Sequence, residues 1–465
     1  MNFSLIKKYY LRNELKFNWK VIFPLKNKFY GLLLRSFNWW PLDLFSRRKK
    51  VSGTDNSEKR IAYYLWEYPA LSQTFIQREI SALKNSFGDV LVCSDISVSN
   101  MKEDNKYVCL MPLNKEKLRK YKIQFFKNNP LNYVNLFLYT VFHNYHFNKT
   151  YNFDKVTFNT AVYLARILKD NNINHIHSPW ADRCAFISLI ASRLLDISYS
   201  VQARAHDIHR DKYLFGFQEK FGNADFVVTN TRYNFEYLHS RLNSSFNGKI
   251  NLIYNGLSLE KFIPDHQNNE GQKIIKLLCV ARLIEQKGLV NLLYACKELK
   301  DKGYKFTCEI IGGPESLYMN YYISLKKLHK KLELQETVFF LEAKPFDEVL
   351  NHFRNADIFV LPCIIAEDGS RDITPNSLIE AMAMKLPVIS TTVTGIPEIV
   401  DDGVNGILIP PNNIEALIET IEKLIGDPQL RKHLGENARK KVEERFDIRK
   451  NINNYVHLFE KQMIN

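Results

Sequence analysis

Short apolar segments alternate with helical segments along most of this chain, and this alternation limits its fold more than any other feature. The strand-like segments of the first half are IAYYLW (61–66), DVLVCS (89–94), INHIHS (173–178), ISYSVQA (197–203) and ADFVVTN (224–230). Those of the second half are KLLCVA (276–281), FTCEIIG (306–312), TVFFLE (337–342), DIFVLP (357–362) and PVIST (387–391). Strands separated by helices of about 10–15 residues indicate parallel sheets wrapped by helices. We therefore expect an α/β protein with two Rossmann-like domains facing a cleft, with ligands beyond the carboxyl ends of the strands.

Composition and the same alternation suggest the domain boundaries. Two polar stretches, VSGTDNSEKR and PDHQNNEGQK, are typical of linkers. The predicted parts are an N-terminal extension with its linker (1–60), an N-terminal domain (61–263), an interdomain linker (264–273), a C-terminal domain (274–440) and a C-terminal helix (441–465) that could return to the N-terminal domain.

The overall composition is that of a soluble globular protein. Of the 465 residues, 45% are hydrophobic and 25% are charged. No run of about 18 apolar residues predicts a spanning helix, and the start of the chain lacks the pattern of a signal peptide. The seven cysteines are scattered without a CxxC pair, so we expect reduced core thiols rather than disulfides or a zinc site.

The positive charge is concentrated at the start of the chain. Residues 1–60 contain 14 Lys and Arg against four acids, which accounts for +10 of the net +14. Such a local charge argues against nucleic acid as a partner of the whole protein. Aromatic residues are interleaved with these cations, a composition that suits an anionic membrane surface. The alternative is an arm that packs on the body of the protein.

The segment AEDGSRDITPNSLIEAMAMKLPVISTTVTGIP (366–397) contains the strongest candidate site. Glu380 lies in an apolar run, where a buried charge is costly unless it binds something. Asp372 lies in the loop before it, and Thr374-Pro375 is a helix start with Thr374 as the expected N-cap. Upstream, Arg282 offers a planar donor fork and Lys287 a mobile point charge. Two cations and a helix N-terminus together suit a diphosphate.

Four stretches of the chain resemble one known family. They are EYPALSQTFIQREI, HIHSPWAD with VQARAHDIHR, ARLIEQKG, and DITPNSLIE. Residues 61–450 resemble the family 4 retaining glycosyltransferases of GT-B fold, and within them the bacterial exopolysaccharide, colanic-acid-type branch. The chain departs from the family pattern at Gln73 and Asp372, where Glu is usual, and at Arg204, where His is frequent.

The resemblance implies a role for each candidate residue. Arg282 and Lys287 would stabilise the leaving diphosphate, Asp372 would hold sugar hydroxyls, and Glu380 would accept the ribose hydroxyls. The remaining nucleotide contacts would come from Gly313, Thr374, Asn376, Ser377 and Glu398. His177 and His206 would line the acceptor side.

The resemblance also implies the reaction. It would be a metal-independent, hexosyltransferase-type transfer with retention, from a UDP- or GDP-sugar to a lipid-linked or polysaccharide-precursor acceptor. The nucleotide sugar would be a co-substrate, and no cofactor is expected. The protein would act in the cytoplasm, peripherally on the inner face of the bacterial membrane, in exopolysaccharide or cell-surface glycan synthesis. The alternatives are a GT-B epimerase and a non-catalytic glycan or nucleotide-sugar binding protein docked at the membrane.

Overall fold

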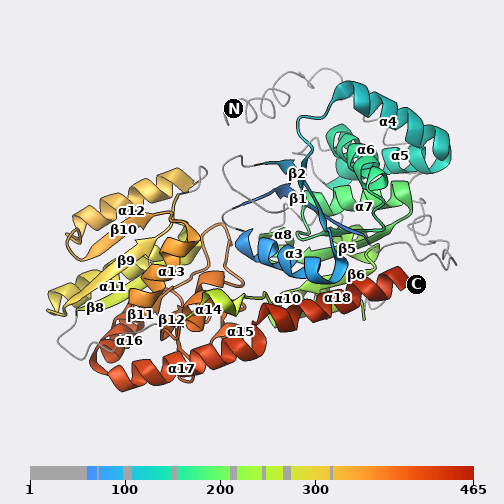
Figure 1. Ribbon diagram of the computed structural model, residues 1–465. Helices are drawn as coiled ribbons and strands as arrows, with labels where there is room; N and C mark the ends of the chain where they lie inside the picture. Colours follow the sequence, from blue (N-terminus) through green and yellow to red (C-terminus); the bar gives the residue numbers. More distant parts are fainter. Residues whose placement is uncertain are drawn as a thin grey trace, which may run out of the picture. The chain divides into compact units, whose positions relative to one another are not determined.

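The computed structural model describes most of the chain beyond the N-terminal extension (Figure 1). The described residues are 60–70, 73–97, 107–147, 154–209, 217–242, 248–264, 274–314 and 318–464. The predicted extension, apart from Arg60, and the predicted interdomain linker, apart from Pro264, lie outside them. None of the helices in the described ranges is long and apolar enough to cross a membrane.

The first sheet has seven parallel strands in the order β3-β2-β1-β4-β5-β6-β7. The strands are β1 (Ile61–Glu67), β2 (Leu91–Ile96), β3 (Tyr107–Cys109), β4 (His175–Ser178), β5 (Ser198–Ala203), β6 (Phe226–Thr229) and β7 (Ile250–Leu252). Its helices are α3 (Thr74–Phe87), α4 (Lys115–Asn128), α5 (Pro130–Phe147), α6 (Asp154–Asp170), α7 (Arg183–Leu195), α8 (His206–His209), α9 (Phe217–Gly222) and α10 (Arg232–Arg241). The first five residues of β1 are all buried, as expected for a parallel strand covered on both faces.

The second sheet has six parallel strands in the order β10-β9-β8-β11-β12-β13. The strands are β8 (Ile275–Val280), β9 (Phe306–Ile311), β10 (Val338–Glu342), β11 (Ile358–Val360), β12 (Val388–Thr391) and β13 (Ile407–Ile409). Its helices are α11 (Leu289–Asp301), α12 (Met319–Lys331), α13 (Phe346–Asn355), α14 (Asn376–Ala383), α15 (Ile396–Ile399), α16 (Ile414–Gly426) and α17 (Pro428–Arg445), with 3₁₀ turns η5 (Leu259–Lys261) and η6 (Glu285–Lys287). In both sheets the order reverses beside the first strand, which is the doubly wound topology. The predicted α/β class with two Rossmann-like sheets is confirmed.

The start of α14 differs from the prediction. The helix begins at Asn376 with Pro375 at the N-cap position, so the expected capping role of Thr374 is wrong. The Thr374 hydroxyl instead accepts a hydrogen bond from Nδ2 of Asn230, at 3.2 Å.

The C-terminal segment forms two helices where the sequence suggests one over 441–465. α17 ends at Arg445, and α18 (Ile448–Ile464) follows. Two backbone hydrogen bonds cause the break, because Leu257 N donates to Phe446 O at 2.7 Å and Ile448 N donates to Leu257 O at 3.1 Å. The Asp447 carboxylate then caps α18 by accepting from Arg449 N at 2.9 Å. Gly256 allows the close approach, since a Cβ there would lie 2.3 Å from Ile448 Cδ1.

Helix α18 packs against α3 and completes the core of the first sheet (Figure 1). Phe459 is fully buried in the same apolar cluster as residues of β1 and β6. Its ring lies 5.1 Å from that of His175 and 5.3 Å from that of Phe226. The last helix of the chain is therefore part of the N-terminal core.

Removing the Phe459 ring should test this packing. We expect Phe459→Ala to lower the free energy of unfolding by about 3–5 kcal/mol, because it leaves a cavity against the first sheet. The measurement is urea denaturation, with the exposed neighbour substitution Glu460→Ala as control. Equal stability of the two variants would contradict the packing.

Candidate functional site

Most of the predicted donor-site residues lie at the carboxyl edge of the second sheet. Arg282 follows β8, Gly313 follows β9, Asp372 lies between β11 and α14, and Glu398 lies in α15 after β12. The carboxyl ends of parallel strands meet at one edge, where ligands of open α/β sheets bind. The structure thus brings together residues that are more than 100 positions apart in the sequence.

Lys287 and Asp372 are paired directly. Lys287 ends η6 and is 7% exposed, and its Nζ donates to Oδ2 of Asp372. Gly288 makes this turn possible, because its φ is +66° and a Cβ would lie 1.8 Å from the Pro362 carbonyl oxygen. Arg282, which precedes Lys287 in the same loop after β8, is exposed. A partly buried lysine–carboxylate pair, with an exposed arginine upstream at the end of β8, can bind a diphosphate and a sugar hydroxyl.

The glycine that the β9 turn requires is Gly312, next to the predicted Gly313. Gly312 has φ +152°, and a Cβ would lie 1.7 Å from the Ala281 carbonyl oxygen. At Gly313 a Cβ would meet the Ala343 side chain at 3.4 Å, an ordinary contact. Close approach of the two loops therefore depends on Gly312.

The polar residues around α14 bond to residues from the first half of the chain. Asn376 Oδ1 accepts from Nδ2 of Asn255 at 3.1 Å. Glu380 is 8% exposed, and its Oε1 accepts from Nη2 of Arg78 on α3 at 2.8 Å. Ser377 lies in the first turn of the helix and is half-buried. The carboxylate expected to receive a ribose is thus already in an ion pair with Arg78.

Glu398 has a well-defined set of partners. Its carboxylate accepts from the backbone N of Arg232 at 2.6 Å and of Tyr233 at 2.9 Å, and from the hydroxyl of Tyr254 at 3.1 Å. The two amides belong to the first turn of α10, where an anion is favoured. These contacts explain Glu398 as a helix cap, and its nucleotide contact stays a prediction.

His177 is buried at the end of β4. Its Nδ1 and the Nε2 of His175 each lie 2.7 Å from the Ser200 hydroxyl. Burial, and then the positive charge of Arg204, lower the pKa of His177 to about 3. A histidine that is neutral at physiological pH is a poor proton donor, and its role on the acceptor side stays a prediction.

The loop after β5 holds His206, the other acceptor-side candidate, and Asp207. His206 begins α8, and its side chain lies outside the described part of the structure. Asp207 is fully buried, and its carboxylate accepts from the backbone N of Ala181, Arg204 and Ala205 at 2.9, 3.2 and 2.6 Å. This carboxylate therefore fixes the loop.

Sequence reasoning missed a buried ion pair behind the site. Arg204 donates from Nη2 to Oε2 of Glu79 at 2.7 Å and from Nη1 to Oδ1 of Asn255 at 2.8 Å. Glu79 lies on the inner face of α3, in the apolar pattern FIQREISAL. The rule that singled out Glu380, a charge on a buried helix face, applies equally to Glu79.

The depressed pKa of His177 predicts a pH dependence of stability. The unfolded chain takes up this proton near pH 6.5 and the folded protein near pH 3, so stability falls as pH drops through that window. We expect the free energy of unfolding to lose about 2 kcal/mol between pH 7 and pH 5 from this group. The measurement is urea denaturation of wild type and His177→Asn at several pH values. The free energy of unfolding should fall less steeply with decreasing pH in the variant than in wild type. Identical slopes would contradict burial of a neutral imidazole.

The second half of the chain is similar to known proteins. Residues 260–441 match the model of the family described as glycosyl transferases group 1. The chain is 36% identical over 176 residues to the amylovoran biosynthesis glycosyltransferase AmsK of Erwinia amylovora, covering 38% of this chain and 42% of that protein. It is 33% identical over 201 residues to the putative colanic acid biosynthesis glycosyltransferase WcaL of Escherichia coli, covering 43% and 48%. The chain spans less than half the length of these curated relatives.

Solved structures share the two-sheet fold. A glycosyltransferase from Rickettsia africae matches with a TM-score of 0.66 at 18% identity, over 88% of this chain and 100% of that one. Alr3699/HepE of Anabaena, in complex with UDP and glucose, matches with a TM-score of 0.65 at 16% identity, over 87% and 100%. The expected GT-B fold and the resemblance to the exopolysaccharide branch are both confirmed. Residues 260–441 are thus similar to the group 1 glycosyl transferases.

Proposed function

We propose that the protein is a retaining glycosyltransferase that moves a sugar from a nucleotide diphosphate sugar to a lipid-linked or polysaccharide-precursor acceptor. The observation that carries this proposal is the Lys287–Asp372 pair near α14, at the carboxyl edge of the sheet in the family-matched region. Relatives named for amylovoran and colanic acid biosynthesis support an exopolysaccharide or cell-surface glycan product.

Each donor contact has a proposed chemical role. Arg282 and Lys287 stabilise the diphosphate as its bond to the anomeric carbon breaks, because cations held in place stabilise developing negative charge. First-turn amides of α14, from Asn376 and Ser377, donate hydrogen bonds to phosphate oxygens. Asp372 holds sugar hydroxyls, and Glu380 accepts the ribose hydroxyls.

The transfer proceeds on one face of the sugar. The acceptor hydroxyl oxygen forms the new bond to the anomeric carbon as the bond to the diphosphate breaks, and the departing phosphate oxygen takes the acceptor proton. No protein nucleophile is needed, and no metal takes part in the proposed route. The protein would work in the cytoplasm on the inner face of the bacterial membrane, with an anionic lipid surface as partner.

Donor-induced stabilisation tests the donor site. A ligand that binds only the folded protein stabilises it by RT ln(1 + [L]/Kd), about 2.7 kcal/mol at roughly 100 Kd. We expect one nucleotide class in a panel of UDP- and GDP-sugars to raise the Tm in EDTA. Arg282→Ala should abolish the shift, whereas Lys331→Ala, an exposed cation at the end of α12, should preserve it. If no donor raises the Tm of the folded wild type, the alternative of a non-catalytic binding protein would be favoured over the transferase.

The Arg78–Glu380 pair gives a second prediction. A ribose that takes both carboxylate oxygens of Glu380 must displace Arg78, whose Nη2 lies 2.8 Å from Oε1. We therefore expect Arg78→Ala to lower the donor Kd by about tenfold, equivalent to roughly 1.4 kcal/mol. The measurement is isothermal titration calorimetry, with Arg78→Lys as the charge-preserving control.

A double-mutant cycle checks that the effect acts through the carboxylate. In a Glu380→Gln background, Arg78→Ala should leave the donor Kd unchanged, because no ion pair remains to be opened. Weaker donor binding by Arg78→Ala in the wild-type background would show that Arg78 binds the donor rather than competing with it.

A further inference from the structure

The helical hairpin formed by α4 and the start of α5 has a surface that the proposed donor site does not use. α4 carries the cations Lys115, Lys117, Arg119, Lys120, Lys122 and Lys127. Glu116 is the single acid between residues 115 and 147, so the helix has a net charge of +5. A helix this basic needs an anionic partner or open solvent.

The outward face of the same hairpin is also apolar. Ile123, Phe126, Leu131 and Val134 are 47%, 46%, 79% and 39% exposed. Four of the 15 large hydrophobic side chains that are exposed in the described ranges thus fall within twelve residues. Single exposed hydrophobic residues are ordinary, whereas a cluster surrounded by cations marks an interaction surface.

The hairpin is anchored firmly on its inner side. Phe125 is buried, the Tyr121 ring lies 5.4 Å from that of Tyr163 on α6, and Asn132 Nδ2 donates to Arg193 O at 2.9 Å. The outward side chains are therefore held by a packed base. Their exposure does not come from a frayed helix end.

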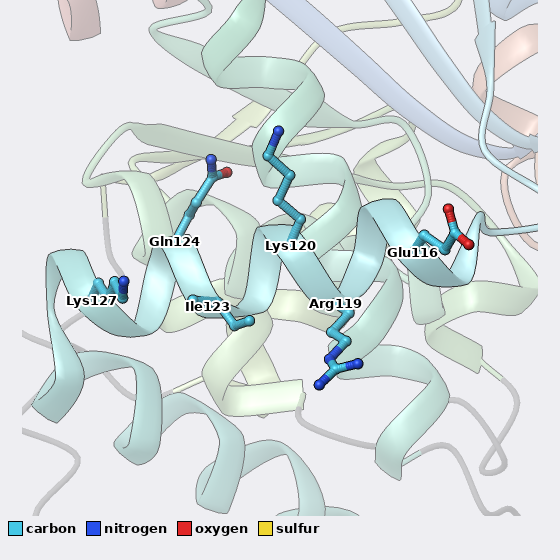
Figure 2. Close-up of a pocket in the computed structure, with 6 residues that line it drawn as sticks. All are labelled: Glu116, Arg119, Lys120, Ile123, Gln124 and Lys127. Atoms are coloured by element: carbon cyan, nitrogen blue, oxygen red, sulfur yellow. The ribbon is translucent and has the colours of Figure 1, made fainter.

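Helix α4 borders a hollow of about 500 Å³ (Figure 2). The described residues that line it are Glu116, Arg119, Lys120, Ile123, Gln124 and Lys127. Figure 2 shows that their long polar side chains extend in different directions along three turns of the helix. Cations around an apolar residue suit a charged headgroup attached to an apolar chain.

We propose that this hairpin docks on an anionic lipid bilayer, with its lysines at headgroup depth and Phe126 and Leu131 inserted among the acyl chains. Amphipathic helices with basic polar sides bind membrane surfaces in this way, through buried apolar area and attraction to anionic lipid.

Other occupants fit the surface less well. Residues 1–60 of the chain carry a net +10 and a second copy would present the same +5 helix, so both are repelled. Single-stranded nucleic acid is bound by stacking its bases on aromatic rings, but three of the four exposed apolar residues are aliphatic. A role for this docking in reaching a lipid-linked acceptor rests on the proposed function, whereas bilayer binding itself requires no sugar transfer.

Vesicle co-sedimentation of the full chain tests the proposal. We expect binding to vesicles of phosphatidylcholine with phosphatidylglycerol, and little binding to phosphatidylcholine alone. Lys120→Gln with Lys127→Gln should weaken binding by about thirtyfold, since each cation near an anionic leaflet contributes roughly fivefold. Phe126→Ser with Leu131→Ser should also weaken it. The matched control is Lys327→Gln with Lys330→Gln, which removes two exposed cations from α12.

Several outcomes would overturn the proposal. Unchanged binding by both hairpin variants would assign the membrane contact to another part of the chain, such as residues 1–60. An equal loss of vesicle binding in the α12 control would indicate a general charge effect. Binding of the protein to single-stranded DNA, without binding to vesicles, would indicate nucleic acid as the partner. Donor-induced stabilisation is measured on the same variants and should be unchanged. Its absence in wild type would remove the proposed function without affecting the vesicle result.

Discussion

The buried guanidinium of Arg204 is the interaction on which the arrangement of the site depends. It is 3% exposed and bonds to Glu79 on α3, to Asn255 after β7 and to the Pro179 carbonyl after β4. Asn255 in turn donates to Asn376 at the start of α14. Breaking a buried ion pair costs about 3–5 kcal/mol, because the remaining charge is left without compensation. One side chain thus joins α3 to the ends of β4 and β7 and, through Asn255, to the start of α14.

Much of the fold could be predicted from the sequence because strands buried on both faces are recognisable as short apolar runs. The predicted strands over 276–281 and 306–312 agree with β8 (Ile275–Val280) and β9 (Phe306–Ile311). β3 and β13, each of three residues, were not predicted. The end of α17 was also missed, because a backbone contact with Leu257, almost 200 residues away, sets it.

The candidate site could be predicted only in part, for a related reason. A charge in an apolar run identified Glu380, and a turn after a strand identified Lys287. Their partners could not be predicted, because Arg78 is 302 residues from Glu380 and Lys287 is 85 residues from Asp372. Local pattern predicts that such a charge needs a partner, whereas the topology of two sheets determines which partner it meets. The same limit explains why Gly313 was chosen over Gly312, whose need for glycine comes from the opposing loop at Ala281.

The position of α18 has a consequence for the order in which the protein can mature during synthesis. The first sheet leaves the ribosome hundreds of residues before Ile452, Tyr455 and Phe459, which complete its core. The apolar cluster of the second sheet extends to Phe446 and is therefore complete before those three residues are made. Domains usually fold in the order of their synthesis. Here the half that is translated first keeps an open apolar face until Ile452, Tyr455 and Phe459 have been made, so the half that is translated second is the first that can close its core.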